Sequence, residues 1–263
     1  MILVTGATGF VGSKILSSCK NVIACKSLRN TSQEDVKRIV EESQVDTIIH
    51  TSAIADIGVC EKNVEESYRA NVQIPVNLAK ACVTNNVKLV CFSSDQVYSG
   101  CDEIGPYTED MAKPSNVYSK HKLEMENRVL DIIPSAVMLR AEWMYDYYLK
   151  KPNYFMNVLN ATDSLSFSSK QFRGITYLQE VVENVVNVVK LSGGAYNFGS
   201  ETTKSMYEIT KEFLHRINKK IELNDIAPRH NLWMNCEKAT LNGVTFSNVE
   251  DGLIKCAKDY NLL

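Results

Sequence analysis

Short apolar runs alternate with amphipathic stretches along the first 140 residues. Continuous or nearly continuous apolar runs occupy residues 1–5, 21–27, 45–50, 87–92 and 136–139. Such runs are typical of parallel strands that are covered on both faces. Between them, apolar residues recur at helical spacing, most clearly over 33–43, 61–85 and 116–130. This alternation predicts an α/β protein with a Rossmann-type, doubly wound parallel sheet.

The regular alternation weakens after residue 140. Residues 146–170 are aromatic and polar without a clear period, whereas 181–191 has the pattern of an apolar helix that returns to the main sheet. We therefore expect a Rossmann domain over residues 1–150, completed by 171–192. Residues 151–170 and 193–263 should form a smaller α+β lobe that binds substrate across a cleft.

Composition excludes several classes of function. The 263 residues carry a formal net charge of −2, which provides no electrostatic footprint for nucleic acid or an anionic membrane. No apolar run approaches the roughly 20 residues of a membrane span, and a strand that starts at residue 2 argues against a signal peptide. Eight cysteines without a C-x-x-C pair or a Cys/His cluster predict free thiols, no metal site and a cytoplasmic protein.

The first apolar run leads directly into a glycine-rich turn, GATGFVG, over residues 6–12. In a dinucleotide cradle the first glycine permits a tight turn, the second lets a phosphate approach the backbone, and the third lets helix and strand pack closely. Backbone N–H groups at the start of the helix then face the pyrophosphate. The alternative is an ordinary strand–turn–helix junction. The predicted cofactor-binding residues of this turn are Gly6, Thr8, Gly9, Phe10, Val11 and Gly12.

The end of the second apolar run bears on the choice of cofactor. NAD-selective folds commonly have a carboxylate there to hold the ribose 2′-hydroxyl. This chain has Lys26 and then Arg29, two cations that could meet a 2′-phosphate. The alternative is a solvated strand end. We predict NADP(H) as the preferred cofactor, with NAD(H) as the other candidate.

Two further segments add residues to the predicted cofactor site. Small residues after the third run, among them Ser52 and Ala53, leave room for a ribose and a nicotinamide. His50, within the run, is interpreted as structural. Pro75 should bend the helix over 61–85 near Asn71, because proline lacks a backbone donor. Asn71 is therefore either a structural cap or part of a proton relay.

The residues that could carry chemistry follow the fourth run. Ser93 and Ser94 stand at the carboxyl edge of the sheet, where ligands of open α/β sheets bind. Tyr118 and Lys122 are four residues apart and thus share one helical face. The ammonium and an oxidised nicotinamide should lower the phenol's pKa toward working pH. This set predicts hydride transfer to a carbonyl that Ser94 holds and Tyr118 protonates.

GATGFVG, SSDQVYSG, PYTED, YSKHKLEME and LRAEWMY, in this order and spacing, resemble the extended short-chain dehydrogenase/reductases. The nearest match is the dTDP-4-dehydrorhamnose reductase family, and the resemblance covers nearly the whole chain. It implies NADPH- or NADH-dependent reduction of the 4-keto group of a nucleotide-activated 6-deoxysugar, as in dTDP-rhamnose and polysaccharide biosynthesis. It also implies a catalytic triad of Ser94, Tyr118 and Lys122. The residues implied on the sugar-nucleotide side are Asp95, Trp143, Asn153 and Arg173.

Departures from the family pattern leave alternatives open. Gln96, Ser119 and His121 replace residues common in the family. Gln96 stands where related dehydratases have a glutamate base, so dehydration is disfavoured, whereas epimerisation remains an alternative. The other alternative is a non-catalytic regulatory subunit that resembles the methionine adenosyltransferase β subunit. A homodimer is expected by the same resemblance.

Overall fold

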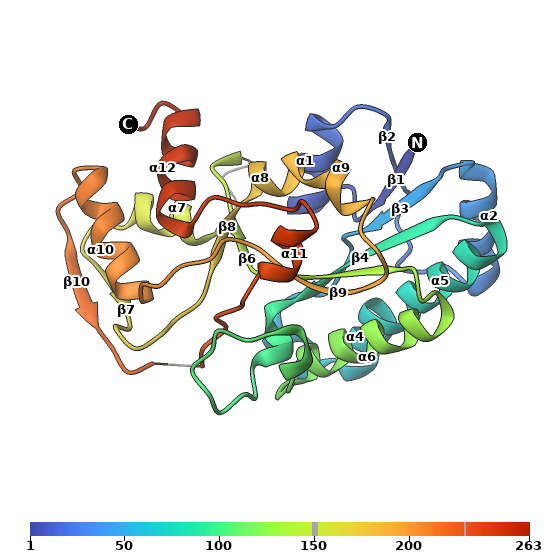
Figure 1. Ribbon diagram of the computed structural model, residues 1–263, viewed down its shortest axis with the longest axis horizontal. Helices are drawn as coiled ribbons and strands as arrows, with labels where there is room; N and C mark the ends of the chain where they lie inside the picture. The colour runs from blue at the N-terminus through green and yellow to red at the C-terminus, as the bar shows by residue number, and fades with distance from the viewer. Residues whose placement is uncertain (149–151, 229) are drawn as a thin grey trace.

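A six-stranded parallel sheet forms the centre of the molecule (Figure 1). The computed structural model describes residues 1–148, 152–228 and 230–263. The strands are β1 (Ile2–Thr5), β2 (Val22–Ala24), β3 (Thr47–His50), β4 (Lys88–Ser94), β5 (Val137–Ala141) and β9 (Gly194–Phe198). Their order is β2-β1-β3-β4-β5-β9, and each neighbouring pair is parallel. The prediction of a doubly wound parallel sheet is confirmed.

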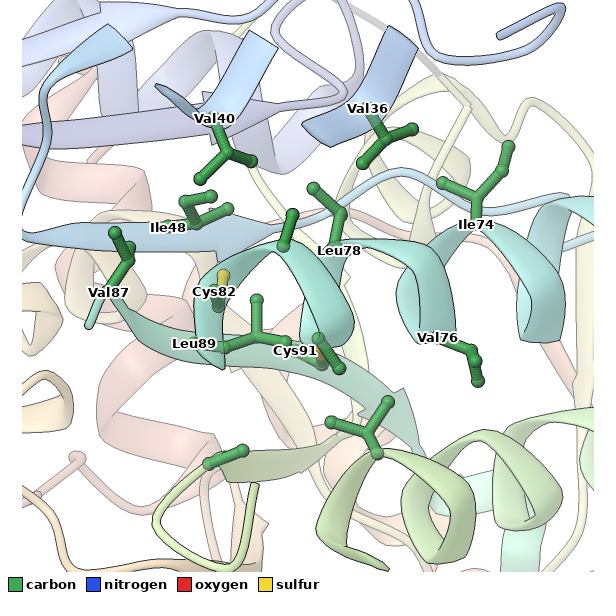
Figure 2. Packing of buried hydrophobic residues seen from close by; sticks show 14 of the residues in the cluster. Val36, Val40, Ile48, Ile74, Val76, Leu78, Cys82, Val87, Leu89 and Cys91 are labelled. Atoms are coloured by element: carbon green, nitrogen blue, oxygen red, sulfur yellow. The ribbon is translucent and has the colours of Figure 1, made fainter. Parts of the chain in front are cut away.

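Helices cover both faces of this sheet, which explains the continuous apolar runs. Successive strand residues point to opposite faces, so Ile48 and Ile49 belong to different cores. Figure 2 shows the first core, where α2 and α5 pack against β3 and β4. Its helices are α2 (Gln33–Ser43), α5 (Ile74–Asn85) and α6 (Val117–Ile132). The helices on the other face are α1 (Phe10–Ser18), α8 (Leu178–Glu183) and α9 (Val185–Val188).

The predicted long helix over 61–85 is interrupted as Pro75 requires. The chain forms α3 (Ile57–Lys62) and α4 (Val64–Tyr68), then a π-helical turn, η1 (Arg69–Gln73), before α5 begins. Pro75 is the second residue of α5, which continues directly from η1 with helical dihedrals, so its missing N–H removes one regular helical bond to the preceding turn. The distortion therefore falls on the turn that contains Asn71.

One boundary of the predicted lobes is wrong. Residues 193–263 were assigned to the smaller lobe, yet β9 is the edge strand of the main sheet and pairs with β5. Tyr196 and Phe198 of β9 are buried in the core that also contains Leu139. Helix α11 (Glu237–Leu241) then packs on β9. The strand joins the sheet because its apolar side chains complete a core that β5 would otherwise leave open.

The rest of the chain builds a separate aromatic core beside the sheet. Residues 146–170, expected to be irregular, contain a helix and a strand within their described part. Tyr145, Phe155, Tyr177 and Phe213 pack together there. The elements are β6 (Trp143–Tyr145), α7 (Tyr154–Asn160), β7 (Ser164–Phe167), β8 (Ile175–Tyr177), α10 (Met206–Arg216), β10 (Glu222–Asp225) and α12 (Val249–Asp259). Figure 1 shows α7, α10 and α12 at the end of the molecule opposite α2.

Cysteine pairing, membrane-spanning helices and metal sites can be assessed for the described residues. All eight cysteines are free thiols. No described helix combines the length and the apolar character needed to cross a bilayer. Likewise, no group of three or more His, Cys, Asp or Glu side chains in the described ranges is arranged to hold a metal ion.

Candidate functional site

A cavity of about 570 Å³ lies at the carboxyl edge of the central sheet. Its walls come from the turn after β1, the loop after β3, the ends of β4 and β5, and helix α6. Open α/β sheets bind ligands at this edge, beside the point where strand order reverses. The predicted residues that line this cavity are Phe10, Val11, Ala53, Ser93, Ser94, Asp95, Tyr118, Lys122, Trp143, Asn153 and Arg173.

The glycine-rich turn has the backbone geometry of a phosphate cradle. Gly6 adopts a φ of +70°, a conformation that favours glycine, and a Cβ there would lie 2.8 Å from the backbone nitrogen of Ser52. A Cβ on Gly12 would lie 2.3 Å from the Gly6 carbonyl oxygen. Helix α1 begins after Gly9, which supplies no side-chain cap, and Thr8 is exposed. The turn thus offers an uncapped helix N-terminus to an anion, and its residues fit a dinucleotide.

The two cations proposed for a 2′-phosphate lie outside the main cavity. Lys26 is exposed just after β2. Arg29 forms an ion pair with Glu66 and lines a second hollow of about 200 Å³. Arg69, from η1, lines the same hollow and was not singled out in the sequence. Arg29 is therefore held by a carboxylate that a 2′-phosphate would have to displace.

Ser94 joins the predicted catalytic phenol to an acidic side chain. Its hydroxyl donates to Asp95 Oδ1 at 3.1 Å and hydrogen-bonds the Tyr118 phenol. Burial raises the pKa of Tyr118, and the Ser94 hydrogen bond opposes that rise only in part. The predicted lowering of this pKa is therefore wrong for the protein alone. A phenol that stays protonated is nonetheless the form that can donate a proton.

Lys122 lies on the same face of α6 as Tyr118, but its ammonium group is hydrogen-bonded to the backbone of β4. Its Nζ donates to the Phe92 carbonyl oxygen at 2.5 Å, and the side chain is 1% exposed. Burial lowers the pKa of Lys122 to about 8. The ammonium is thus fixed to the end of β4, which explains why it does little to acidify the phenol.

The start of α6 explains one departure from the family pattern. Asn116 caps the helix by accepting from the backbone N–H of Ser119 at 2.8 Å. Ser119 Oγ in turn accepts from the Asn116 backbone N–H at 3.1 Å. This reciprocal capping box needs a hydroxyl at 119, where a glycine could not serve. It fixes the turn that presents Tyr118.

Asn71 clamps the loop after β3. Its Oδ1 accepts from the Ile54 N–H at 3.0 Å, and its Nδ2 donates to the Ile54 carbonyl at 3.0 Å. Nδ2 also lies 3.2 Å from Ser67 Oγ, which hydrogen-bonds His121. These contacts support the structural alternative for Asn71. His50 is likewise structural in position, because it is buried and hydrogen-bonds Thr5 at 2.7 Å.

The other end of the cavity gathers polar residues from distant segments. Arg173 forms an ion pair with Asp95 at 2.7 Å, and its guanidinium lies over the Trp143 ring. Asn153 caps α7 and donates to the Asp146 carbonyl at 2.7 Å. Burial raises the pKa of Asp95, whereas Arg173 opposes this rise. This end can bind polar, hydroxyl-rich groups.

Two buried acids at this edge were missed by the sequence reasoning. Glu126, one turn beyond Lys122, accepts from Ser93 and forms an ion pair with Arg140 at 2.7 Å. Glu142, directly after β5, lines the cavity, and burial raises its pKa to about 8. An acidic residue that immediately follows a buried apolar strand is the signal that could have identified Glu142.

Comparison with protein families and curated proteins gives a consistent result. The model of the RmlD substrate binding domain matches residues 1–232. A dTDP-4-dehydrorhamnose reductase of Aggregatibacter actinomycetemcomitans is 28% identical over 225 residues, which cover 79% of this chain and 76% of that protein. One from Mycolicibacterium smegmatis is 32% identical over 151 residues, 55% of this chain and 46% of the relative. Methionine adenosyltransferase 2 subunit beta of Danio rerio is 27% identical over 234 residues, 80% and 71% of the two chains.

Solved structures show the same fold. A dTDP-4-dehydrorhamnose reductase from Bacillus anthracis, in complex with NADP, has a TM-score of 0.86 at 20% identity and covers 98% of both chains. A Thermus thermophilus UDP-glucose 4-epimerase, in complex with NAD, has a TM-score of 0.80 at 19% identity, with 99% and 98% coverage. At these identities the likeness concerns the fold alone.

Proposed function

The chain belongs to the family of the RmlD substrate binding domain, and on this premise we propose that it is an NAD(P)H-dependent sugar-nucleotide reductase. Its substrate would be the 4-keto group of a nucleotide-activated deoxysugar. The observation that carries the proposal is the convergence of Ser94, Tyr118 and Lys122 on one cavity with an uncapped glycine cradle. Curated relatives named dTDP-4-dehydrorhamnose reductase support the same reaction.

The proposed roles follow from the hydrogen bonds of the site. Ser94 would hold the carbonyl oxygen, because its hydroxyl already bridges Tyr118 and Asp95. Tyr118 would give the proton to that oxygen as the carbonyl carbon is reduced. A bound nicotinamide cofactor would supply the hydride. Lys122, whose Nζ donates to the Phe92 carbonyl oxygen, would hold the ribose hydroxyls of the cofactor.

The cofactor should lie over the cradle and the loop that Asn71 holds. Its pyrophosphate would meet the start of α1, and its nicotinamide half would extend past Ala53 and Ser93 toward Ser94. NADP(H) is the preferred form in this proposal, with Lys26 and Arg29 near the 2′-phosphate. The sugar nucleotide would occupy the opposite end, beside Asp95, Trp143, Asn153 and Arg173.

Gln96 separates this proposal from a dehydratase. It lines the cavity directly after Asp95, and its amide is hydrogen-bonded by Asn116 at 3.4 Å. An amide has no useful proton affinity near neutral pH, so it cannot remove a proton from a sugar ring. The protein should therefore consume NADPH stoichiometrically and accept a 4-keto sugar that a separate enzyme makes.

A substrate screen tests the proposal directly. Purified protein is mixed with dTDP-, UDP- or GDP-linked 4-keto-6-deoxysugars, and loss of NADPH or NADH absorbance is followed. We expect consumption with at least one nucleotide and none with unmodified dTDP- or UDP-glucose. A 4-keto product formed from such hexoses without added NADPH would refute the reductase and support a dehydratase.

A second candidate is a regulatory subunit, favoured by the match to methionine adenosyltransferase 2 subunit beta over 80% of this chain. Two results together would support it: no cofactor turnover with any keto-sugar nucleotide, and co-purification with a methionine adenosyltransferase. Turnover with a keto sugar at enzymatic rates would exclude a purely regulatory role. For either function we propose a reducing, cytoplasmic setting, in keeping with the free thiols, and a homodimer.

A further inference from the structure

The side chain of Glu142, at the end of β5, is enclosed by the segments that contain Gly174 and Gly199. It is buried, and the residue is 6% exposed. A Cβ on Gly174 would lie 1.9 Å from Glu142 Oε1, and one on Gly199 would lie 2.2 Å from Oε2. A side chain at either position would displace the carboxyl from where it lies. The carboxyl is therefore built into the wall of the cavity that Glu142 lines.

The hydrogen bonds at this carboxyl indicate which oxygen carries a proton. Thr176 Oγ1 accepts from the Ser200 N–H at 3.0 Å and donates its own proton to Glu142 Oε2 at 2.8 Å. Oε2 is thus an acceptor in this arrangement, so a proton held by the carboxyl belongs on Oε1. Oε1 lies on the side of Gly174, and Arg173, the residue before Gly174 in the chain, lines the same cavity.

Among the described residues, the carboxyl of Glu142 has no partner cation. The titratable groups that face it are Asp95 from η2 (Asp95–Tyr98), Arg173 before β8, and Cys236. Arg173 is already paired with Asp95, and Cys236 has a pKa well above its usual value because of burial. Within the described ranges Glu142 forms no ion pair. A buried carboxylate without a cation is costly, so the carboxyl retains its proton near neutral pH, with a pKa of about 8.

We propose that Glu142 is a specificity-determining residue whose carboxyl O–H donates a hydrogen bond to an oxygen of the sugar moiety. The inference rests on the proposed reductase function and names a recognition contact within it. Together with the Asp95–Arg173 pair, the neutral acid gives the sugar end both donors and acceptors while its net charge stays near zero. Loss of the proton removes a donor and adds a second negative charge beside Asp95.

The consequence is a substrate affinity that falls as pH rises. If only the protonated carboxyl binds the sugar, the affinity for the sugar nucleotide should drop about tenfold between pH 7 and pH 9. Affinity is the informative quantity because Lys122 also has a pKa of about 8 and affects turnover in the same range. The free nucleoside diphosphate lacks the sugar, so its binding should not show this dependence.

The experiment compares wild type with Glu142→Gln, which keeps the shape and an N–H donor but does not ionise. Binding is measured by calorimetry from pH 6.5 to 9 with the 4-keto-sugar nucleotide accepted in the screen above and with its free nucleoside diphosphate. Glu201→Gln serves as the control, because Glu201 is exposed and is not among the residues that line the cavity. We expect the tenfold loss in wild type and in Glu201→Gln, and an affinity nearly independent of pH in Glu142→Gln.

Two outcomes would overturn the inference. One is an alkaline loss of affinity in Glu142→Gln equal to that of wild type. The other is an infrared titration in which wild type and Glu142→Gln lose the same protonated-carboxyl absorption between pH 6.5 and 9. The infrared titration needs no turnover, so it tests the protonation of Glu142 independently of the reductase proposal. Failure of the reductase proposal is shown instead by a screen in which no sugar nucleotide is accepted.

Discussion

The two ends of the cavity are built in different ways. The proposed catalytic end takes Ser94, Tyr118 and Lys122 from one strand end and from α6, the next long helix of the chain. The proposed sugar end takes Asp95, Glu142 and Arg173 from three segments, and Thr176 and Ser200 form hydrogen bonds beside Glu142. A short stretch of chain therefore specifies the first end, whereas the second exists only when β5, β8 and β9 come together.

Among the described residues, Lys122 at one end and Glu142 at the other are buried ionisable groups of opposite sign that form no ion pair. Lys122 is a cation held by a backbone carbonyl, and Glu142 is an acid held by a hydroxyl. Burial lowers one pKa and raises the other, each to about 8. For these two groups burial, rather than an ion pair, sets the pKa, whereas Asp95 in the sugar end is paired with Arg173.

The largest effect should come from the scaffold that the two ends share. Arg140, in β5, forms a buried ion pair with Glu126, which also accepts from Ser93. Arg140→Leu leaves the Glu126 carboxylate without its cation and should lower the free energy of unfolding by about 3–5 kcal/mol. Urea denaturation measures this. A double variant that also replaces Glu126 with Leu should recover much of the loss, and a single-variant change under about 1 kcal/mol would contradict the shared scaffold.

Tyr118→Phe should affect the catalytic end alone. Removal of the proton donor should reduce kcat by about 10²-fold or more, while sugar-nucleotide and cofactor affinities stay near those of wild type. Steady-state kinetics with equilibrium binding provide the readout. Tyr68→Phe is the matched control, because its phenol oxygen bonds Glu124 and its ring does not line the cavity. Wild-type turnover in Tyr118→Phe would refute the proposed proton donor.

The two buried ionisable groups should give pH dependences of opposite sign. Between about pH 4.5 and 8 the folded state holds a proton on Glu142 that the unfolded state has lost, so stability falls as pH rises. Between about pH 8 and 10.5 the unfolded state holds a proton on Lys122 that the folded state has lost, so stability rises. Each slope is at most about 1.4 kcal/mol per pH unit.

Urea denaturation across this range checks the signs separately for each end. Glu142→Gln should remove the fall below pH 8 and leave the rise above it, and Lys122→Met should do the reverse. The same change in both variants would show that the two ends are not independent.

The smallest effect concerns the cofactor's 2′-position. We expect a several-fold to tens-fold preference for NADPH over NADH from Lys26 and Arg29 together, and Lys26→Asp should reduce it by about fivefold or less, because an exposed ion pair contributes only about 0–1 kcal/mol. The ratio of kcat/KM for the two cofactors is the measurement, and it should shrink in high salt. Lys37→Asp, an exposed position on α2, is the control. An unchanged ratio would show that Lys26 does not contact the 2′-phosphate, and the hollow that Arg29 and Arg69 line would be the next candidate.

Local sequence determined the catalytic end and most of the sheet. The runs that became β1, β3, β4 and β5 are apolar throughout because both faces of the sheet are covered. The four-residue spacing of Tyr118 and Lys122 sets one helical face whatever the rest of the chain does. The interruption near Asn71 followed from Pro75 for the same reason, since a missing N–H is a local property.

Tertiary structure decided what depends on contacts between distant segments. The membership of β9 in the main sheet, the protonated carboxyl of Glu142 between Gly174 and Gly199, and the raised pKa of Tyr118 all follow from burial. Burial is a property of the assembled fold, because it depends on which segments exclude water from a side chain. The sequence therefore predicted the type of reaction that we propose, and the packing of β5, β8 and β9 determined the burial of Glu142 at the proposed sugar end.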